Sequence, residues 1–235
     1  MIFLLFLSIF KEKVCTLGKN LYLCDRIFGK VMVMKQLVFA TNNTHKLDEV
    51  KALLKEAGDE IAANFEILSL DDIGCHDDIP ETGMTFSDNA LQKAEYVKVH
   101  YNLDCFADDS GLEVRALGME PGVRSARYAD DGGFFHNSDA NMDKLLRNMT
   151  NIRERQTQFR TVIVLLMDGK RLEFEGICRG EITRDRSGSK GFGYNPVFMP
   201  EGHNITFAEM SMEDKNLISH RGKAVRQLVR YLATL

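Results

Sequence analysis

From residue 35 onward, short β-rich segments alternate with amphipathic helical segments, and this alternation restricts the chain to a sheet that helices cover. Strands are expected at 36–41, 65–70 and 104–107. Helices are expected at 47–57 and 86–101, where apolar residues recur every three or four positions and would form one buried stripe.

The second half of the chain adds a hairpin. Residues 159–167 are apolar and β-branched, Asp168-Gly169 is a tight-turn pair, and residues 172–183 return as the second strand. Together with the earlier alternation, this hairpin predicts an α/β fold with a mixed sheet and helices on its faces. Residues 112–117 are expected to be extended and 119–137 irregular. Further helices are expected at 139–149, 212–219 and 223–232.

The first 33 residues differ in composition from the rest of the chain. Residues 1–10 are almost entirely apolar, but they are too few to span a bilayer, which needs about 20 residues. The basic residues follow this apolar run, whereas a signal peptide carries them before it. Residues 1–33 contribute a net charge of +3, which leaves −7 for residues 34–235. We therefore expect 1–33 to be an N-terminal extension outside the fold, in preference to a membrane anchor, and 35–235 to form the folded domain.

Charge and cysteine content argue against several classes of protein. The net charge is −4 and both signs are mixed along the chain. The basic surface typical of nucleic-acid-binding proteins is therefore absent, although a local cluster of Lys and Arg could still bind a small anion.

The five cysteines are odd in number and no two form a C-x-x-C pair, which argues against a disulfide framework or a structural zinc site. Free thiols in a reducing cytosol are the simpler explanation. We expect a cytoplasmic protein with neither nucleic acid nor membrane among its partners.

The polar turn after the first strand has the features of a phosphate site. Residues 41–46 read Thr-Asn-Asn-Thr-His-Lys and run into the start of a helix. Free backbone N–H groups and the positive end of the helix can hold phosphate there, and Lys46 can add a full charge. An ordinary capped helix explains the same residues equally well.

Two adjacent carboxylates, Asp108 and Asp109, follow the strand expected at 104–107, whose last three residues are apolar. Such a pair at the end of an apolar strand is costly unless a cation or hydrogen-bond donors meet it. Hard oxygen ligands of this kind suit Mg²⁺ that is bound together with substrate phosphates. Glu81 could supply a further carboxylate. The alternative is that these acids are solvated loop residues.

Two further segments carry groups suited to a nucleotide. In 191–196, glycines flank aromatic residues, which allows a flat ligand to stack with the backbone close by. A buried aromatic turn is the alternative there. Lys215, His220 and Arg221 place three cationic groups at or near helix ends. For these residues the alternative is a solvated basic helix face.

Six motifs in fixed order resemble the inosine triphosphate pyrophosphatases, which remove dITP, ITP and XTP from the nucleotide pool. Each motif alone is weak, but the six together at this spacing are specific, and the resemblance covers about residues 35–235. In this chain the motifs are Thr41/Asn43/Lys46, Glu81-Thr82-Gly83, 106–112 (FADDSGL), 121–128 (PGVRSARY), 191–196 (GFGYNP) and 219–222 (SHRG).

The resemblance implies an elongated two-lobed α/β fold around a long mixed sheet, with helices on both faces, an active cleft between the lobes and a homodimeric state. It implies Mg²⁺-dependent hydrolysis between the α- and β-phosphates, which gives a nucleoside monophosphate and pyrophosphate. A noncatalytic purine nucleotide-binding module remains the main alternative, and a structural protein with solvated acidic loops is another.

Residue roles follow from matching the motifs. Asp109 matches the general base, and Glu81, Asp108 and Asp109 match the metal-holding carboxylates. Phe192 would stack on the purine, and His220 and Arg221 match the pair that reads the base. Asn195 departs from the family, which usually has Asp there, so base selectivity is the property this change would affect. The matched substrate-binding positions are Thr41, Asn42, Asn43, Thr44, His45, Lys46, Ser110, Phe192, Gly193, Tyr194, Asn195, Lys215, His220 and Arg221.

Overall fold

The computed structural model describes residues 13–17, 20–24, 31–56, 58, 63–129 and 137–235 of the chain. Within these residues, six strands form one mixed sheet in the order β5-β4-β6-β7-β8-β9. The strands are β4 (Lys35–Phe39), β5 (Phe65–Leu68), β6 (Cys105–Val114), β7 (Gln156–Met167), β8 (Lys170–Ile182) and β9 (Phe198–Pro200). β5, β4 and β6 run parallel, and β6 to β9 pair antiparallel, so the predicted mixed sheet is confirmed.

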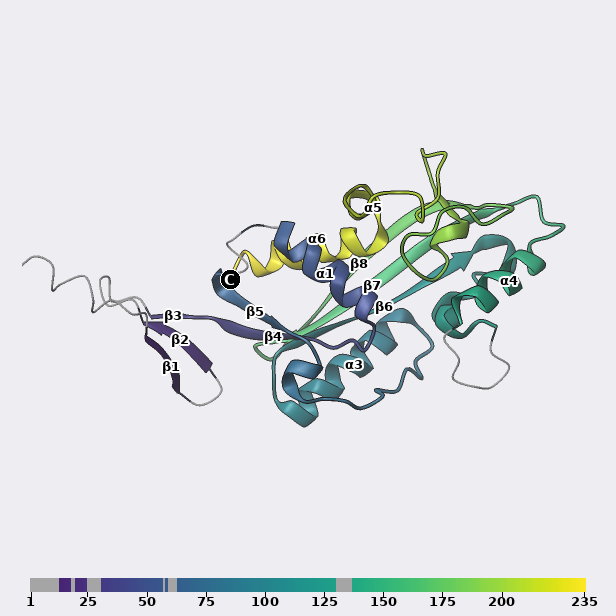
Figure 1. The fold of residues 1–235 in the computed structure, drawn as a ribbon. Coiled ribbons are helices and arrows are strands. Elements are labelled where there is room, and N and C mark those ends of the chain that lie inside the picture. The colour runs from purple at the N-terminus through teal and green to yellow at the C-terminus, as the bar shows by residue number, and fades with distance from the viewer. Residues whose placement is uncertain (1–12, 18–19, 25–30, 57, 59–62, 130–136) are drawn as a thin grey trace, which may run out of the picture.

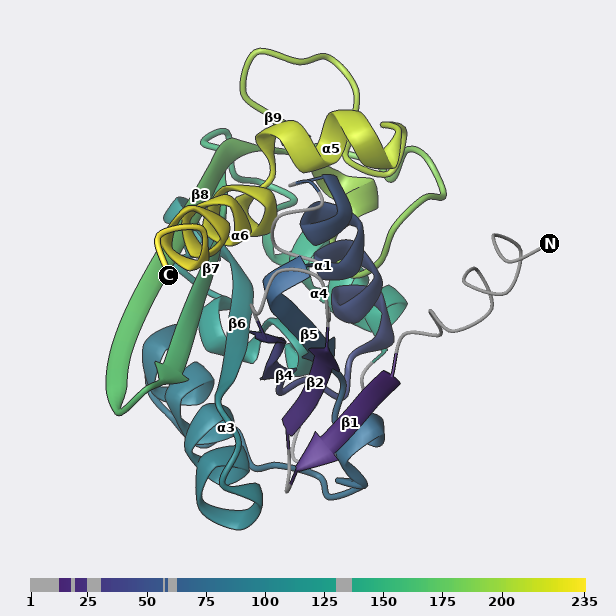
Figure 2. The ribbon, with the colours of Figure 1, turned by 90° about the vertical axis from the view of Figure 1, so that its left-hand side faces the viewer.

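Helices cover both faces of this sheet (Figure 1). They are α1 (Thr44–Glu56), α3 (Phe86–Tyr101), α4 (Ser138–Asn148), α5 (Met212–Ile218) and α6 (His220–Leu232). Figures 1 and 2 both show α1 and α6 on one face and α3 on the other. The elongated α/β fold with helices on both faces is therefore as expected.

The alternation of side chains along the strands divides the core between the two faces. Leu37 and Phe39 of β4 pack with α1 and α6, and Phe39 stacks on Phe106 with ring centroids 4.7 Å apart. Val38 of β4 and Ala107 of β6 instead pack with α3. A third cluster joins α4 to the far ends of β6, β7 and β8, and it forms the second lobe.

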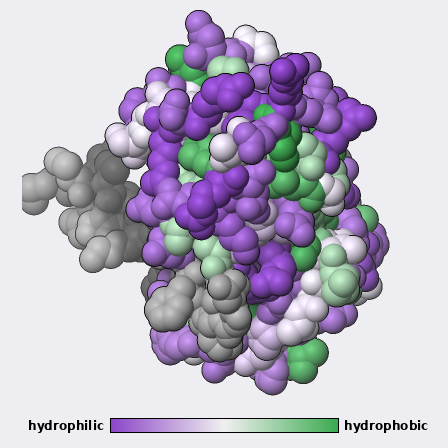
Figure 3. Space-filling view, turned by 90° about the vertical axis from the view of Figure 1, so that its right-hand side faces the viewer, coloured by the Kyte–Doolittle hydropathy of each residue, from purple (hydrophilic) through white to green (hydrophobic). Residues whose placement is uncertain are grey.

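The second lobe presents a largely hydrophilic surface, with small apolar areas between charged groups (Figure 3). No helix in the described part of the chain is long and apolar enough to cross a membrane.

The expectation that β-structure pauses at residues 108–111 was wrong. β6 runs unbroken from Cys105 to Val114, because β7 pairs with it at all ten positions. Its parallel partner β4 ends earlier, with Phe39 opposite Phe106. Asp108 and Asp109 therefore lie within a strand, just past the end of the neighbouring strand. After Val114 the chain forms a 3₁₀ turn over Arg115–Leu117 where extended structure was expected.

Other boundaries agree more closely with the sequence. α3 spans Phe86–Tyr101 as predicted, and Thr85 and Asp88 form a capping box at its start. α6 begins at His220, three residues before its predicted start, because the Ser219 side chain caps it by accepting from the Gly222 N–H. The irregular segment 119–137 contains a 3₁₀ turn, Gly122–Arg127, and its residues 130–136 lie outside the described part.

Part of the N-terminal segment forms a sheet of its own. β1 (Lys13–Leu17), β2 (Asn20–Cys24) and β3 (Val31–Val33) pair antiparallel, separately from the six-stranded sheet (Figure 2). The placement of 1–33 outside the main domain stays a prediction, and its apolar residues 1–10 lie outside the described residues.

Candidate active site

Asp108 is the centre of a buried ionic cluster on the face of the sheet that α1 and α6 cover. Its Oδ1 accepts from the Lys46 ammonium at 3.1 Å, and its Oδ2 accepts from Arg221 Nε at 3.3 Å and from Ser110 Oγ at 3.0 Å. The side chain is fully buried. Burial alone would raise the pKa of Asp108, but Lys46, Arg221 and Lys93 outweigh burial and hold it well below its usual range. Asp108 is therefore a permanent anion.

Asp109 lies on the opposite face, toward α3, because neighbouring residues of a strand point to opposite sides. Its Oδ2 accepts from Asn89 Nδ2 at 2.9 Å, and its Oδ1 accepts from the Ser110 backbone N–H at 2.9 Å. Burial raises its pKa, and although Lys93 and Lys46 oppose this, the nearby Glu81 adds to it, so the pKa lies above the ordinary value for Asp. A carboxylate with a raised pKa is a better proton acceptor, which suits a general base.

Lys93 connects Glu81 to the backbone of β6, and sequence reasoning missed it. Its ammonium donates to Glu81 Oε1 and to the backbone oxygen of Asp108, both at 2.6 Å. Burial lowers the pKa of Lys93, but Asp109, Glu81 and Asp108 outweigh burial and raise it, so Lys93 is a cation. Asn89 and Lys93 are polar residues four apart within the buried stripe of α3. That interruption of an apolar stripe is the signal that could have identified them.

The Glu81-Thr82-Gly83 segment is fixed against the start of α3. The Gly83 N–H donates to Asn89 Oδ1 at 2.7 Å. A Cβ at Gly83 would lie only 2.5 Å from Asp88 Cβ, so only glycine fits this close approach. Arg127 from the second lobe donates to the Glu81 backbone oxygen at 2.8 Å. Glu81 is thereby placed beside Lys93.

The turn before α1 is shaped by its own side chains. Asn43 Oδ1 accepts from the Lys46 N–H and Thr41 Oγ1 from the Asn43 N–H, both at 3.2 Å. Asn42 instead donates to the Asp77 backbone oxygen, away from the acids. The turn is thus an ordinary capped helix start, and it also directs Lys46 onto Asp108.

A second buried cluster connects α1 to α5 and α6. Glu49 of α1 accepts from both Lys215 of α5 and Arg221 of α6, and all three side chains are less than a tenth exposed. Arg221 therefore bridges Glu49 and Asp108. Glu49 lies one helical turn after Lys46 beside apolar positions of α1, and the sequence analysis did not assign it a role.

His220 is buried, and does not lie on the solvated basic helix face that was the alternative for this segment. Its ring stacks on Phe159 with centroids 4.6 Å apart, and it also faces Phe207. Burial, with Arg221 and Lys215 nearby, lowers its pKa well below 6.5, so the imidazole is neutral. Within the described structure its Nδ1 has no hydrogen-bond partner.

The glycine-rich loop presents one aromatic ring and buries the other. Phe192 is half-buried and stacks on His45, with centroids 5.1 Å apart and planes 12° from parallel. Lys215 Nζ and Arg221 Cζ lie 5.8 and 5.7 Å from the centre of the same ring. Tyr194 is buried and its hydroxyl donates to the Ser125 backbone oxygen at 3.0 Å, so this aromatic anchors the loop.

The structure therefore gathers only some of the predicted residues. Lys46, Ser110 and Arg221 each contact the Asp108 carboxylate, and Glu81 contacts Lys93, whose ammonium also contacts the Asp108 backbone oxygen. Asn42 and Tyr194 point elsewhere. Across the described ranges, no group of three or more His, Cys, Asp or Glu side chains is placed to hold a metal ion. The three predicted carboxylates therefore do not converge, because Asp108 and Asp109 occupy opposite faces of β6.

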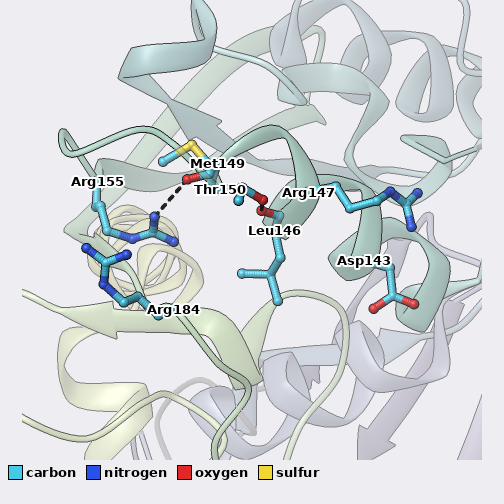
Figure 4. Close-up of a pocket in the computed structure, with 7 residues that line it drawn as sticks. All are labelled: Asp143, Leu146, Arg147, Met149, Thr150, Arg155 and Arg184. Carbon is cyan, nitrogen blue, oxygen red and sulfur yellow. Dashed lines mark hydrogen bonds between the residues drawn. The ribbon is translucent and has the colours of Figure 1, made fainter.

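One hollow of the described structure lies away from these clusters, beside α4. A cavity of about 380 Å³ beside α4 is lined by Asp143, Leu146, Arg147, Met149, Thr150, Arg155 and Arg184 (Figure 4). Arg155 there donates to the backbone oxygens of Met149 and Thr183. This cavity includes none of the sequence-predicted site residues, so the chemistry of the buried ionic clusters, and not cavity size, identifies the candidate site.

Comparisons with known proteins give the family and the solved structures to which the chain is similar. The model of the Ham1 family matches residues 37–231. The dITP/XTP pyrophosphatase of Flavobacterium johnsoniae is 51% identical over 197 residues, which cover 84% of this chain and 97% of that protein. The dITP/XTP pyrophosphatase of Porphyromonas gingivalis is 51% identical over 200 residues, which cover 85% and 98%. Among solved structures, a HAM1 protein from Coxiella burnetii superposes with a TM-score of 0.76 at 34% identity and covers 86% of this chain and 100% of its own.

Proposed function

The chain belongs to the Ham1 family, and from this premise we propose that it hydrolyses dITP, ITP and XTP to the nucleoside monophosphate and pyrophosphate. As an enzyme it is a hydrolase of acid anhydrides that removes noncanonical purine nucleotides from the nucleotide pool. The dITP/XTP pyrophosphatases to which it is similar support this substrate class.

The buried cation cluster around Asp108 is the observation that carries the proposal. Lys46 and Arg221 contact the Asp108 carboxylate, and Lys93 contacts its backbone oxygen. Hydrolysis of a phosphoanhydride depends mainly on positioning and on neutralising charge that spreads over the phosphate oxygens. Lys46 and Lys93, both held by contacts to Asp108, supply both without reorganisation during the reaction, and Arg221 holds the Asp108 carboxylate in place.

Asp109 accepts the proton of the attacking water in this proposal. Its raised pKa makes it a stronger base than an exposed Asp, and Asn89 and the Ser110 N–H fix its orientation. Lys93, which contacts Glu81, stabilises the negative charge beside it. The two aspartates therefore have separate roles: Asp108 orders the cations, and Asp109 moves the proton.

The donor set fits Mg²⁺ that is bound jointly with the substrate. Mg²⁺ is usually held by one or two carboxylates together with phosphate oxygens and water, so a cage of three carboxylates is not required. Glu81 and Asp109 are the better candidates, because both oxygens of Asp108 already accept from cations or from Ser110. When bound, the ion would supply charge neutralisation at the phosphates. Ligation by Asp108 stays a prediction.

Base selection is assigned to the groups around Phe192. The Phe192 ring provides a face for a purine, and Lys215 and Arg221 beside it can donate to the 6-keto oxygen of inosine or xanthosine. The 6-amino group of adenine would meet these donors with a donor of its own, which disfavours ATP. Among the described residues, the buried Nδ1 of His220 has no hydrogen-bond partner, and neither has the Nδ2 of Asn195, which lies in the same loop as Phe192.

A panel of nucleoside triphosphates tests the proposal. ITP, dITP, XTP, GTP and ATP are incubated with Mg²⁺, and pyrophosphate and monophosphate are measured. We expect equal amounts of the two products from the first three substrates and no turnover in excess EDTA. Orthophosphate as the first product would contradict cleavage between the α- and β-phosphates, and Mg²⁺-dependent binding without turnover would favour the noncatalytic module.

We further propose that the protein works as a cytoplasmic homodimer whose partners are small nucleotides, and that it binds neither nucleic acid nor membranes. A net charge of −7 over residues 34–235 supports the absence of nucleic-acid binding. Light scattering after size-exclusion chromatography measures the mass, and a mass of about 27 kDa would contradict the dimer, since one chain is 26.7 kDa.

A further inference from the structure

We propose that His45 competes with the purine base for the face of Phe192 and thereby sets the affinity of this enzyme for its nucleotide. The inference rests on the proposed function, because it names how the same site admits its base. His45 belongs to the turn that was predicted to hold phosphate, but its ring lies against Phe192.

The stack joins two parts of the chain that hold opposite ends of the proposed substrate. His45 lies in the first turn of α1, directly before Lys46, which faces the phosphate region. Phe192 lies in the loop that faces the base region. A nucleotide with its phosphates at Lys46 and its base at Phe192 approaches the ring from the α1 side. That is the side on which the His45 imidazole lies, parallel to Phe192 within 12°.

The imidazole can leave this position readily. His45 is exposed, and within the described residues no hydrogen bond or ion pair of its side chain accompanies the stack. A purine presents a larger aromatic face than an imidazole and therefore stacks more strongly. Lys215 and Arg221 stay near Phe192 and can donate to a 6-keto purine, which imidazole does not offer them. Replacement of the His45 ring by the purine on the face of Phe192 is therefore favourable. Because the His45–Phe192 stack must first be broken, the net affinity of the protein for the nucleotide is reduced.

Substitutions of opposite effect test the competition. His45→Ala removes the competing ring, and we expect the KM for ITP to fall by about 2- to 10-fold, the equilibrium factor of one aromatic pair. His45→Phe keeps a competing ring, and its KM should be equal to or above that of the parent. Inorganic tripolyphosphate has no base, so its inhibition constant should change less than two-fold in His45→Ala.

His100→Ala is the matched control, because His100 is also exposed and its ring contacts an aromatic side chain, Tyr96, outside the site. It should leave the KM unchanged. Combining His45→Ala with Phe192→Ala should remove the gain in affinity, since no ring remains to compete for. A higher KM for ITP in His45→Ala, or a KM within 1.5-fold of the parent, would overturn the inference, and weaker inhibition by tripolyphosphate would assign His45 to the phosphates instead.

Imidazole resonances of the full-length protein give a readout that does not need turnover. The His45 ring protons should shift when ITP is added with EDTA, and should not shift with tripolyphosphate. Phe192→Ala should produce a similar shift without nucleotide. Hydrolysis of ITP without displacement of His45 would refute the competition alone. Displacement of His45 by ITP in a protein that hydrolyses no purine triphosphate would refute the proposed function alone, and absence of any ITP binding would refute both.

Discussion

Asp108 and Asp109 are adjacent in sequence, but their side chains lie on opposite faces of β6 and contact different groups. Their pKa values therefore differ in direction. Asp108 accepts from Lys46 and Arg221 on one face of β6, whereas Asp109 accepts from Asn89 on the other. The pKa of Asp108 is lowered and that of Asp109 is raised. Two titratable groups whose environments drive their pKa values apart are typical of an acid–base site.

Replacement of the base should be specific in its effect. We expect Asp109→Asn to lower kcat by about 10²–10⁴, the usual contribution of a general base, while ITP still binds. The side chain keeps its size and one acceptor oxygen for either Asn89 Nδ2 or the Ser110 N–H, so we expect the variant to remain folded although its amide NH₂ faces the other donor. Asp168→Asn is a matched control at the exposed β7–β8 turn and should leave kcat unchanged. Steady-state kinetics decide the matter, and a kcat of Asp109→Asn within a few-fold of the parent would remove Asp109 from this role.

Asn195 should affect the choice of base and not the metal requirement. Its side chain is buried, and its Nδ2 has no partner within the described residues. Asn195→Asp replaces this donor with an acceptor, and an unpaired mismatch in a closed site costs about 1–3 kcal/mol, or about 5- to 150-fold in kcat/KM. We therefore expect the ITP:GTP and XTP:GTP ratios of kcat/KM to shift while activity still needs Mg²⁺. Ratios within two-fold of the parent would indicate that Asn195 supports the loop only.

His220 should make the free energy of unfolding depend on pH between 5 and 6.5. Its folded pKa is lowered by burial and by Arg221, so the unfolded chain binds a proton here that the native protein does not. Stability therefore rises as pH rises toward the unfolded pKa, and it falls as pH drops below that pKa because only the unfolded chain then takes up the proton. Urea unfolding at pH 5, 6 and 7 measures this loss. His220→Phe should flatten the dependence, whereas His203→Gln, at an exposed histidine, should not.

At the scale of elements, local patterns predicted the helices better than the strands. α3 was predicted to the residue because its apolar stripe and its capping box are both local. The unbroken course of β6 through Gly111 was not predicted, because its ten pairs with β7 are contacts across more than 40 residues of chain. Lys93 and Glu49 were missed for the same reason: their partners lie on other elements. Motif matching found Lys46, Asp108, Asp109 and Arg221, but only the fold shows that the aspartates face apart.

The close contact between β8 and α6 should be sensitive to a single methyl group. A Cβ at Gly176 would lie 1.9 Å from the His220 backbone oxygen and 2.8 Å from the Ala224 nitrogen, so α6 would have to move. We expect Gly176→Ala to lower the free energy of unfolding by about 1–3 kcal/mol, as overpacking of a core does. Arg179→Ala, at an exposed position of the same strand, should change it by less than about 0.5 kcal/mol. Denaturant unfolding compares them, and equal losses in the two variants would contradict this packing argument.

At the scale of the whole molecule, one sheet joins the two lobes and places the candidate site between them. β6 to β8 run from the α1–α3–α6 lobe into the lobe that contains α4. Lys46 and Lys93 come from the first lobe, whereas Phe192 belongs to the loop that Tyr194 anchors to Ser125 in the second. The predicted cleft between the lobes is therefore consistent with where these groups lie.

The N-terminal segment should be dispensable. The Ham1 match begins at residue 37. The F. johnsoniae and P. gingivalis pyrophosphatases align over 97% and 98% of their own lengths, and these alignments cover 84% and 85% of this chain. β1 to β3 form a separate sheet, and every group of the candidate site follows residue 40. A chain starting at Met34 should therefore keep kcat, KM and the far-ultraviolet circular dichroism expected for the main domain, with a melting temperature within a few degrees of the parent. A soluble but inactive truncation would show that residues 1–33 take part in the site. Binding of the full chain to lipid vesicles that is lost on truncation would restore the membrane-anchor interpretation of residues 1–10.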